Sequence, residues 1–370
     1  MDAIQRFEQD LQPFGDTTHV LGSRHLTERM HYYGVPGVSI GVIDDGVLAW
    51  ARGYGRYALD DDRPVTADTR FAAASISKPL VAMAVLRLVQ DGVLDLDTDV
   101  NYYLTSWKVP DDAHMQQHPV TLRGLLSHSA GTTLYGFWGY RPGVPLPHLV
   151  QILDGLPPSN AVPVRVDVPP GSRWRYSSGG YVILQQLLID VLNQPFPDAL
   201  QELVLAPLGM HASAFQPAPL PHLEAITACG HDATGAPIPG KWRVHPDLGS
   251  AGLWSTPSDI AKFVIDVQQS QYGQSNKILS SNMTKQMLSV QISNWALGFA
   301  IDGEGAAARF AHGGAALGFR CYMVAYCQRG QGAVIMTNGD RGDHLCIEVL
   351  HSLARTYRWP EYYHYLDNSV

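Results

Sequence analysis

Short apolar runs separated by turn residues predict β-hairpins near both ends of the chain. The run GVSIGVIDDGVLAWARGYG, residues 37–55, places two β-rich segments on either side of Asp44-Asp45-Gly46, a strong turn signal. A second hairpin is predicted where FRCYMVAYC and GAVIMTN flank the turn QRGQG, and the preceding WALGFAI and RFAH have the composition of further strands. Neighbouring hairpins favour an antiparallel sheet over a parallel one.

The middle of the chain has denser apolar spacing, which is typical of helices. The segment SKPLVAMAVLRLVQDG carries Pro79 in its first turn and Gly92 just past its end, as helix boundaries prefer. The segments TLRGLLSHSAG, GYVILQQLLIDVLNQ and STPSDIAKFVIDVQQ are also predicted to be helical. We therefore expect an α+β fold in which residues 1–70 and 245–370 build one antiparallel sheet domain. A mostly helical domain, residues 71–244, is inserted between them.

Composition and charge narrow the function classes. The chain has 370 residues, of which 45% are apolar and 16% charged, values typical of a globular protein with a sizeable core. A net charge of −8 without any basic run argues against a nucleic-acid partner. No leader pattern opens the chain and no apolar run is long enough to span a bilayer. We expect a cytoplasmic location, or a secreted protein if a leader has been removed.

The four cysteines do not indicate a metal site or a disulfide scaffold. Cys229, Cys321, Cys327 and Cys346 form no C-x-x-C, and no histidine pair accompanies them at zinc-ligand spacing. Free cysteine packs as a small hydrophobic side chain. We therefore expect plain thiols and no bound metal.

One lysine stands in an unusually apolar segment. FAAASISKPLVAMAVL contains a single ionisable side chain, Lys78, near the start of a predicted helix. The positive end of the helix dipole and apolar burial both lower the pKa of a lysine and favour its neutral amine. Ser75 lies three residues earlier on the same face, where the amine can accept its proton. The alternative is a lysine that extends out of a core helix, with Ser75 as its N-cap.

Two further segments contain side chains suited to the same chemistry. PPGSRWRYSSGGY places Tyr176 after a Pro-Gly turn and just before a helix, where a phenol beside Lys78 would relay protons. RFAHGGAALGF places His312 at a strand end, before two glycines that allow a ligand to approach the backbone. The alternatives are an ordinary packing tyrosine and a bulge or hairpin histidine.

The order S-x-x-K, Y-S-S, H-G-G resembles the three-motif pattern of serine β-lactamases and penicillin-binding proteins. The closer resemblance is to the class C branch, with its esterase and D-aminopeptidase relatives. It rests also on GVPGVSIGVI, LLSHSAG, APLGM, SAGLWSTPSDIAKF and HGGAALGFR, and it extends from about Gly34 to Asn338. The resemblance implies an antiparallel sheet flanked by terminal helices, a helical domain and an active site in the cleft between them.

The resemblance also implies a role for each motif. Ser75 would be the acylated nucleophile, and Lys78 and Tyr176 would share the acid–base work, with the base for Ser75 left open. The backbone N–H groups of Ser75 and Ala315 would form the oxyanion hole. No metal or organic cofactor is implied. The oxyanion and substrate-binding positions are His312, Gly313, Gly314, Ala315 and Ser178.

Two departures from the family pattern weaken the case for β-lactam hydrolysis. Ser178 stands where the second motif usually has an asparagine that contacts the substrate. His312 stands where β-lactamases have a lysine that holds the substrate carboxylate, and histidine is mostly neutral at pH 7. Arg320 is a candidate for the missing positive charge, and its alternative is a surface arginine on a strand.

The predicted function is therefore a serine hydrolase that acts on an ester or a small amide or peptide bond. The alternatives are a β-lactamase or penicillin-binding DD-carboxypeptidase, and a non-catalytic scaffold that keeps the fold. The expected partner is a small-molecule or short-peptide acyl substrate, and a homo-oligomer is left open.

His128 in LLSHSAG is expected to be structural, since residues adjacent on a helix do not face each other. The segment LYGFWGYRPG, residues 134–143, is expected to line the cleft.

Overall fold

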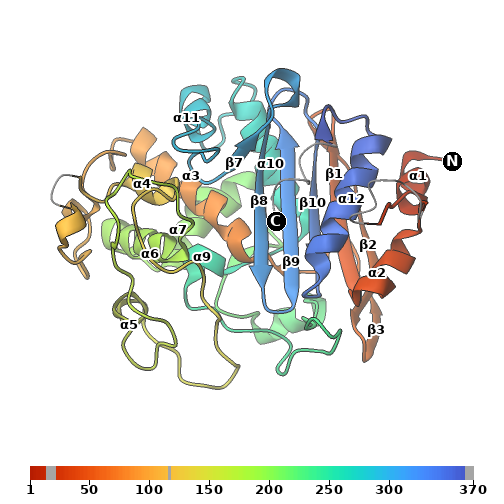
Figure 1. The fold of residues 1–370 in the computed structure, drawn as a ribbon, viewed down its shortest axis with the longest axis horizontal. Coiled ribbons are helices and arrows are strands. Elements are labelled where there is room, and N and C mark those ends of the chain that lie inside the picture. The colour runs from red at the N-terminus through yellow and green to blue at the C-terminus, as the bar shows by residue number, and fades with distance from the viewer. Residues whose placement is uncertain (14–21, 116–117, 363–370) are drawn as a thin grey trace.

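A seven-stranded antiparallel sheet forms the centre of the computed structural model, which describes residues 1–13, 22–115 and 118–362 (Figure 1). The strand order is β3-β2-β1-β10-β9-β8-β7, so strands from both ends of the chain lie side by side, as predicted. The strands are β1 (Gly37–Asp44), β2 (Val47–Ala58), β3 (Asp61–Pro64), β7 (Ala300–Asp302), β8 (Arg309–Ala316), β9 (Phe319–Tyr326) and β10 (Gly332–Thr337).

The turn between β1 and β2 shows why the first predicted hairpin forms. Asp45 and Gly46 have φ angles of 50° and 72°, and two consecutive left-handed residues are what a tight hairpin turn requires. β1 then pairs with β2 on one side and with β10 on the other. Both predicted hairpins are confirmed, and β1 becomes a buried central strand because the two pack together.

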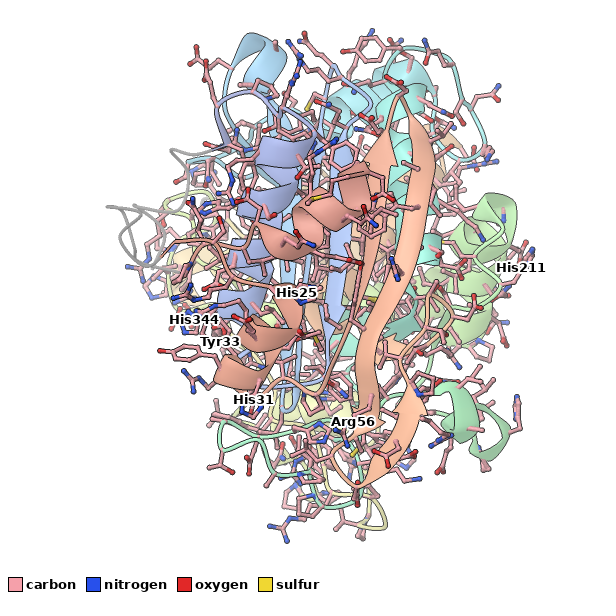
Figure 2. The ribbon with its side chains drawn as sticks, turned by 90° about the vertical axis from the view of Figure 1, so that its right-hand side faces the viewer. His25, His31, Tyr33, Arg56, His211 and His344 are labelled. Atoms are coloured by element: carbon pink, nitrogen blue, oxygen red, sulfur yellow. The ribbon has the colours of Figure 1, made fainter. Side chains whose placement is uncertain are left out.

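Helices from the two ends of the chain cover one face of the sheet (Figure 1). Phe7, Met30 and Leu345 from three different helices pack with Val38 and Ile40 of β1 in one apolar cluster. The expected antiparallel sheet with flanking terminal helices is confirmed. Tyr33 and His344 stack here with ring centroids 5.6 Å apart (Figure 2). The helices are α1 (Ala3–Gln9), α2 (Leu26–Tyr33) and α12 (Gly342–Thr356).

On the other face of the sheet, the strands pack with the internal helices in a larger apolar core. Phe263 of α10 and Phe310 of β8 belong to the same cluster as Leu80 of α3 and Val182 of α6. A small sheet with the order β4-β6-β5 joins the helical region to the segment that leads back into the large sheet. The elements are α3 (Ser77–Gln90), α4 (Leu122–Leu126), α5 (Leu149–Asp154), α6 (Ser178–Leu192), α7 (Phe196–Leu200), α8 (Ala206–Leu208), α9 (Leu248–Ala251), α10 (Pro257–Ser270), α11 (Ser281–Met287), β4 (Phe71–Ala72), β5 (Ala214–Phe215) and β6 (Leu253–Ser255).

Three local predictions differ from the structure. The strand expected over WALGFAI is reduced to β7, because Gly298 has a φ of 98° and turns the chain just before it. The helix expected over TLRGLLSHSAG ends at Leu126, followed two residues later by His128 with a φ of 59°. His312 is not at a strand end but within β8, since Gly313 and Gly314 continue to pair with β9.

Within the described ranges, no helix is both long enough and apolar enough to cross a membrane. All four cysteines lie in these ranges and have free thiols, as predicted.

Candidate active site

Ser75 lies in a strained turn just ahead of α3. The residue before it, Ala74, has a φ of 48°, a left-handed conformation that costs free energy for any residue with a side chain. Ser77 holds the turn in place, because its hydroxyl donates to the Ala74 carbonyl at 2.6 Å and accepts from the Leu253 N–H at 3.0 Å. The turn therefore fixes Ser75 at the beginning of the helix.

Lys78 is fully buried beside Ser75. Its Nζ lies 2.9 Å from the Ser75 hydroxyl and 2.9 Å from the Ser250 carbonyl oxygen. Burial lowers the pKa of Lys78 to about 7, although the attraction of Asp247 works in the opposite direction. A large share of the amine is therefore neutral at physiological pH, and its lone pair lies within hydrogen-bonding distance of the hydroxyl.

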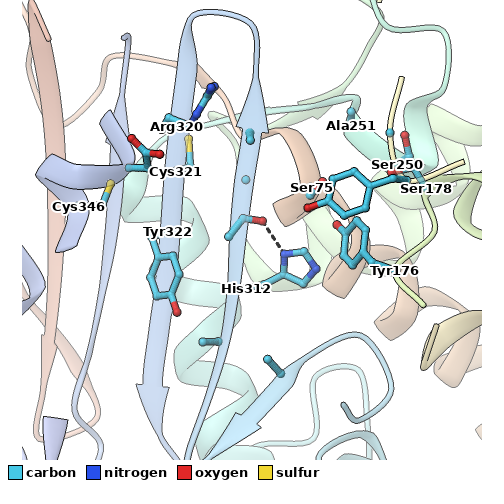
Figure 3. Close-up of a pocket in the computed structure, with 18 of the residues that line it drawn as sticks. Ser75, Tyr176, Ser178, Ser250, Ala251, His312, Arg320, Cys321, Tyr322 and Cys346 are labelled. Carbon is cyan, nitrogen blue, oxygen red and sulfur yellow. Dashed lines mark hydrogen bonds between the residues drawn. The ribbon is translucent and has the colours of Figure 1, made fainter. Parts of the chain in front are cut away.

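Tyr176 approaches Ser75 from the loop before α6. Ser177 is the N-cap of that helix and accepts from the Gly180 N–H at 3.0 Å, which positions the residue before it. The Tyr176 phenol interacts electrostatically with the Ser75 side chain, and its ring centroid lies 5.1 Å from Lys78 Nζ. Ser75 and Tyr176 both face the same pocket (Figure 3). Burial raises the pKa of Tyr176 above its usual value, so the phenol keeps its proton at neutral pH.

His312 faces this group from β8 (Figure 3). Its Nδ1 lies 2.6 Å from the Gly313 carbonyl oxygen, which only accepts hydrogen bonds, so Nδ1 carries the proton. Nε2 is buried and has no hydrogen-bond partner among the described residues. Burial, aided by the charge of Lys78, lowers the pKa of His312 to about 3. His312 is therefore neutral and offers the site an acceptor nitrogen.

The two glycines after His312 differ in their surroundings. A Cβ added at Gly314 would overlap the carbonyl oxygen of Ala73, next to the turn that carries Ser75. A Cβ added at Gly313 would meet the Tyr322 ring at 3.6 Å and the Cys321 carbonyl oxygen at 3.9 Å, both ordinary contact distances. Glycine at position 314 therefore lets β8 pass close to Ser75, and Ala315 follows it along the same strand.

Ser75, Tyr176 and His312 line a cavity of about 530 Å³, whereas Lys78 is buried next to Ser75 and does not reach the cavity wall. Ser178, the first residue of α6, belongs to the lining, and its N–H donates to the Leu134 carbonyl at 2.8 Å. Of the segment 134–143, which was expected to line the cleft, only Tyr135, Gly136 and Phe137 line the cavity. The cavity brings together all the predicted site residues that face it: Ser75, Tyr176, Ser178, His312, Gly313, Gly314 and Ala315.

The Beta-lactamase family model matches residues 23–348. The chain belongs to this family. Esterase EstB of Burkholderia gladioli is 30% identical over 202 residues, 52% of this chain but only 50% of the esterase. Penicillin-binding protein 4 of Amycolatopsis lactamdurans is 28% identical over 327 residues, 82% of this chain and 81% of that protein.

Solved structures of the family share the fold. The D-amino acid amidase from Ochrobactrum anthropi superposes with a TM-score of 0.70 at 22% identity, covering 89% of this chain and 96% of the amidase. The octameric penicillin-binding protein homologue from Pyrococcus abyssi gives a TM-score of 0.70 at 23% identity. The match covers 89% of this chain and 75% of the homologue. The fold predicted from the resemblance is thus the fold of the Beta-lactamase family.

Arg320 does not supply a free positive charge to this Beta-lactamase-family site. It lines the cavity, but its Nη1 lies 2.9 Å from the Asp340 carboxylate and donates to the Ala316 carbonyl at 2.7 Å. The carboxylate offsets its charge at the end of the β8–β9 hairpin. A substrate carboxylate would have to compete with Asp340 for it.

Three residues of the site were not predicted from the sequence. His128 packs against Tyr176, with ring centroids 4.3 Å apart, and Trp295 contacts both rings from the segment before β7. Asp247 lies buried behind Lys78 and accepts hydrogen bonds from the Ser250 side chain. The rule for adjacent helix residues does not apply to LLSHSAG, because the helix ends at Leu126 and His128 lies in the turn that follows it. The rule also carries no information on contacts with a tyrosine 48 positions away.

Among the described residues, no group of three or more histidine, cysteine, aspartate or glutamate side chains is arranged to hold a metal ion.

Proposed function

We propose that this chain is a serine hydrolase that forms an acyl-enzyme on Ser75 and hydrolyses an ester or a small amide bond. The observation that carries the proposal is the 2.9 Å separation of Lys78 Nζ and Ser75 Oγ, combined with a Lys78 pKa of about 7. A base with a pKa near the working pH is the most effective proton acceptor. The esterase and amidase among the relatives support the same class of reaction.

In the acylation step one proton moves, and the bond between the acyl carbon and the leaving group is replaced by a bond to Ser75 Oγ. Ser75 Oγ bonds to the acyl carbon while its proton passes to the neutral Lys78 amine. When the tetrahedral intermediate collapses, the bond to the leaving group breaks, and the proton returns from Lys78 to the leaving-group oxygen or nitrogen through the Tyr176 hydroxyl. We assign the base role to Lys78, because the raised pKa of Tyr176 leaves too little phenolate at neutral pH. Water then repeats the same steps and frees Ser75.

The negative charge that develops on the carbonyl oxygen requires hydrogen-bond donors. We assign this role to the backbone N–H groups of Ser75 and Ala315, since both residues line the cavity. The close approach of β8 at Gly314 supports the assignment. His312 and Ser178 would then contact the remainder of the substrate.

The charges around the cavity favour an ester or amide without a carboxylate near His312. His312 presents an acceptor nitrogen, which repels a carboxylate, and Arg320 is already paired with Asp340. Substrates of β-lactamases and carboxypeptidases carry a carboxylate, so we rank those activities second. A scaffold without catalysis is the third possibility, and a Ser75→Ala variant separates it from the other two.

The test is the intact mass of the protein after mixing with four acyl donors: a short p-nitrophenyl ester, a D-Ala peptide, a D-amino amide and a cephalosporin. We expect a transient adduct with the ester or the D-amino amide, located on Ser75 by peptide mapping and missing in Ser75→Ala. A long-lived cephalosporin adduct with no ester turnover would favour the second activity. If no donor modifies Ser75, the proposed hydrolase function is wrong.

A further inference from the structure

We propose that His128 is a positioning residue for the proposed reaction, holding Tyr176 in line with Ser75 through contacts to three consecutive residues. The inference rests on the hydrolase function proposed above, and it assigns a role to a residue outside the three sequence motifs.

The contacts of His128 form a clamp around Tyr176. The His128 carbonyl accepts from the Arg175 N–H at 2.8 Å, and Nδ1 accepts from the Ser177 N–H at 3.1 Å. Between these two hydrogen bonds, the imidazole lies against the Tyr176 ring with centroids 4.3 Å apart and planes tilted by 32°. The backbone before and after Tyr176 and the ring itself are therefore all held by one histidine.

The turn that carries His128 is itself fixed. His128 has a φ of 59°, which costs free energy for a residue other than glycine and persists only when its surroundings impose it. The Ser129 N–H donates to the Gly124 carbonyl at 2.8 Å, and the hydroxyls of Ser127 and Ser129 hydrogen-bond to each other at 2.9 Å. A rigid support of this kind is what a positioning residue requires.

The His128 imidazole is neutral, so it places no second positive charge beside Lys78. Full burial, together with the charge of Lys78, holds the pKa of His128 well below its usual range. Since Nδ1 accepts a hydrogen bond, the proton is on Nε2, which has no partner among the described residues. His128 therefore contributes an acceptor and an aromatic face next to Lys78 without adding a second positive charge.

Three substitutions at His128 distinguish the contribution of the Nδ1 acceptor from the contribution of the aromatic ring. In His128→Asn the side-chain oxygen takes the place of Nδ1, so the hydrogen bond from Ser177 is kept while the ring is lost. His128→Phe keeps an aromatic face but leaves the Ser177 N–H buried without a partner. His128→Gln carries its polar atoms near the position of Nε2 and also loses the acceptor at Nδ1.

The kinetic experiment measures turnover of a short p-nitrophenyl ester by the full chain. We expect His128→Phe and His128→Gln to lower kcat about 10- to 100-fold with KM within twofold, because a misplaced Tyr176 slows proton transfer rather than binding. His128→Asn should recover most of the lost kcat. Wild-type kcat in His128→Phe, or equal losses in His128→Asn and His128→Phe, would overturn the proposal.

A second measurement does not depend on activity. Hydrogen exchange of the peptide that covers residues 175–178 should accelerate about tenfold in His128→Phe, as expected for one lost hydrogen bond, and much less in His128→Asn. Unchanged exchange in His128→Phe and His128→Gln would overturn the clamp. If the wild-type chain forms no acyl adduct while the exchange result holds, the proposed function fails and the clamp stands.

His231 provides a matched control. It is also fully buried and bonds to the backbone, with Nδ1 2.9 Å from the Asn338 carbonyl and Nε2 accepting from the Leu59 N–H at 3.2 Å. It does not line the cavity. His231→Phe should reduce stability as a buried substitution does, while kcat and exchange at residues 175–178 stay at wild-type values.

Discussion

Replacing Lys78 by methionine should cost activity and change how the free energy of unfolding depends on pH. The side chain has no exposed surface, and burial lowers its pKa from 10.5 to about 7. The unfolded chain therefore binds one proton more than the folded chain between these two values. Folded stability consequently rises with pH across this window and is lowest below pH 7, where the buried amine must be charged. Methionine has a similar length and no proton to bind.

The size of the effect follows from the shift. One pKa unit corresponds to about 1.4 kcal/mol, so the shift of Lys78 amounts to roughly 5 kcal/mol in full. Only part of this free-energy difference develops between pH 7 and pH 9.5, the range in which unfolding is measured. Between pH 7 and pH 9.5, the wild-type chain should gain about 3 kcal/mol relative to Lys78→Met, while groups common to both chains cancel.

The assay is urea unfolding of the wild-type and Lys78→Met chains at several pH values between 7 and 9.5. The difference in unfolding free energy should change steadily in favour of the wild type as the pH rises. A difference that changes by less than about 1 kcal/mol would refute the buried, low-pKa amine. In parallel, wild-type acylation should fall about tenfold per unit below pH 7, as Lys78 becomes protonated.

Three further predictions concern the strand beside Ser75, its histidine and a buried ion pair. Gly314→Ala should lower kcat/KM at least 100-fold, because the new methyl group forces β8 away from the nucleophile, whereas Gly313→Ala, which has room, should stay within threefold. His312→Gln should leave the midpoint of the pH–rate profile unchanged, since the pKa of His312, about 3, lies outside the working range; a shift of more than one unit would contradict this. Glu348→Gln should destabilise the chain by about 3–5 kcal/mol in urea unfolding, because it leaves the buried Arg29 guanidinium without its carboxylate; a loss below about 1 kcal/mol would show that the pair contributes little.

The sequence by itself determined the structural features that depend on residues close together along the chain. The Asp45-Gly46 turn predicted the first hairpin because few residue pairs adopt two left-handed conformations in succession. The spacing of Ser75 and Lys78 placed the hydroxyl and amine together because three positions make about one helical turn. The segments around Tyr176 and His312 indicated two further candidates, and the family resemblance assigned roles to all of these residues.

Only the tertiary structure decided which distant residues complete the site and how they ionise. The Ser250 carbonyl behind Lys78 and the imidazole of His128 against Tyr176 come from segments 172 and 48 positions away along the chain. No local pattern encodes such contacts, since they depend on how sheet and helices pack. The low pKa of Lys78 has the same origin, because a pKa shifts with the burial and charges around a group. For that reason the lysine could be singled out from its sequence, while its state had to come from the fold.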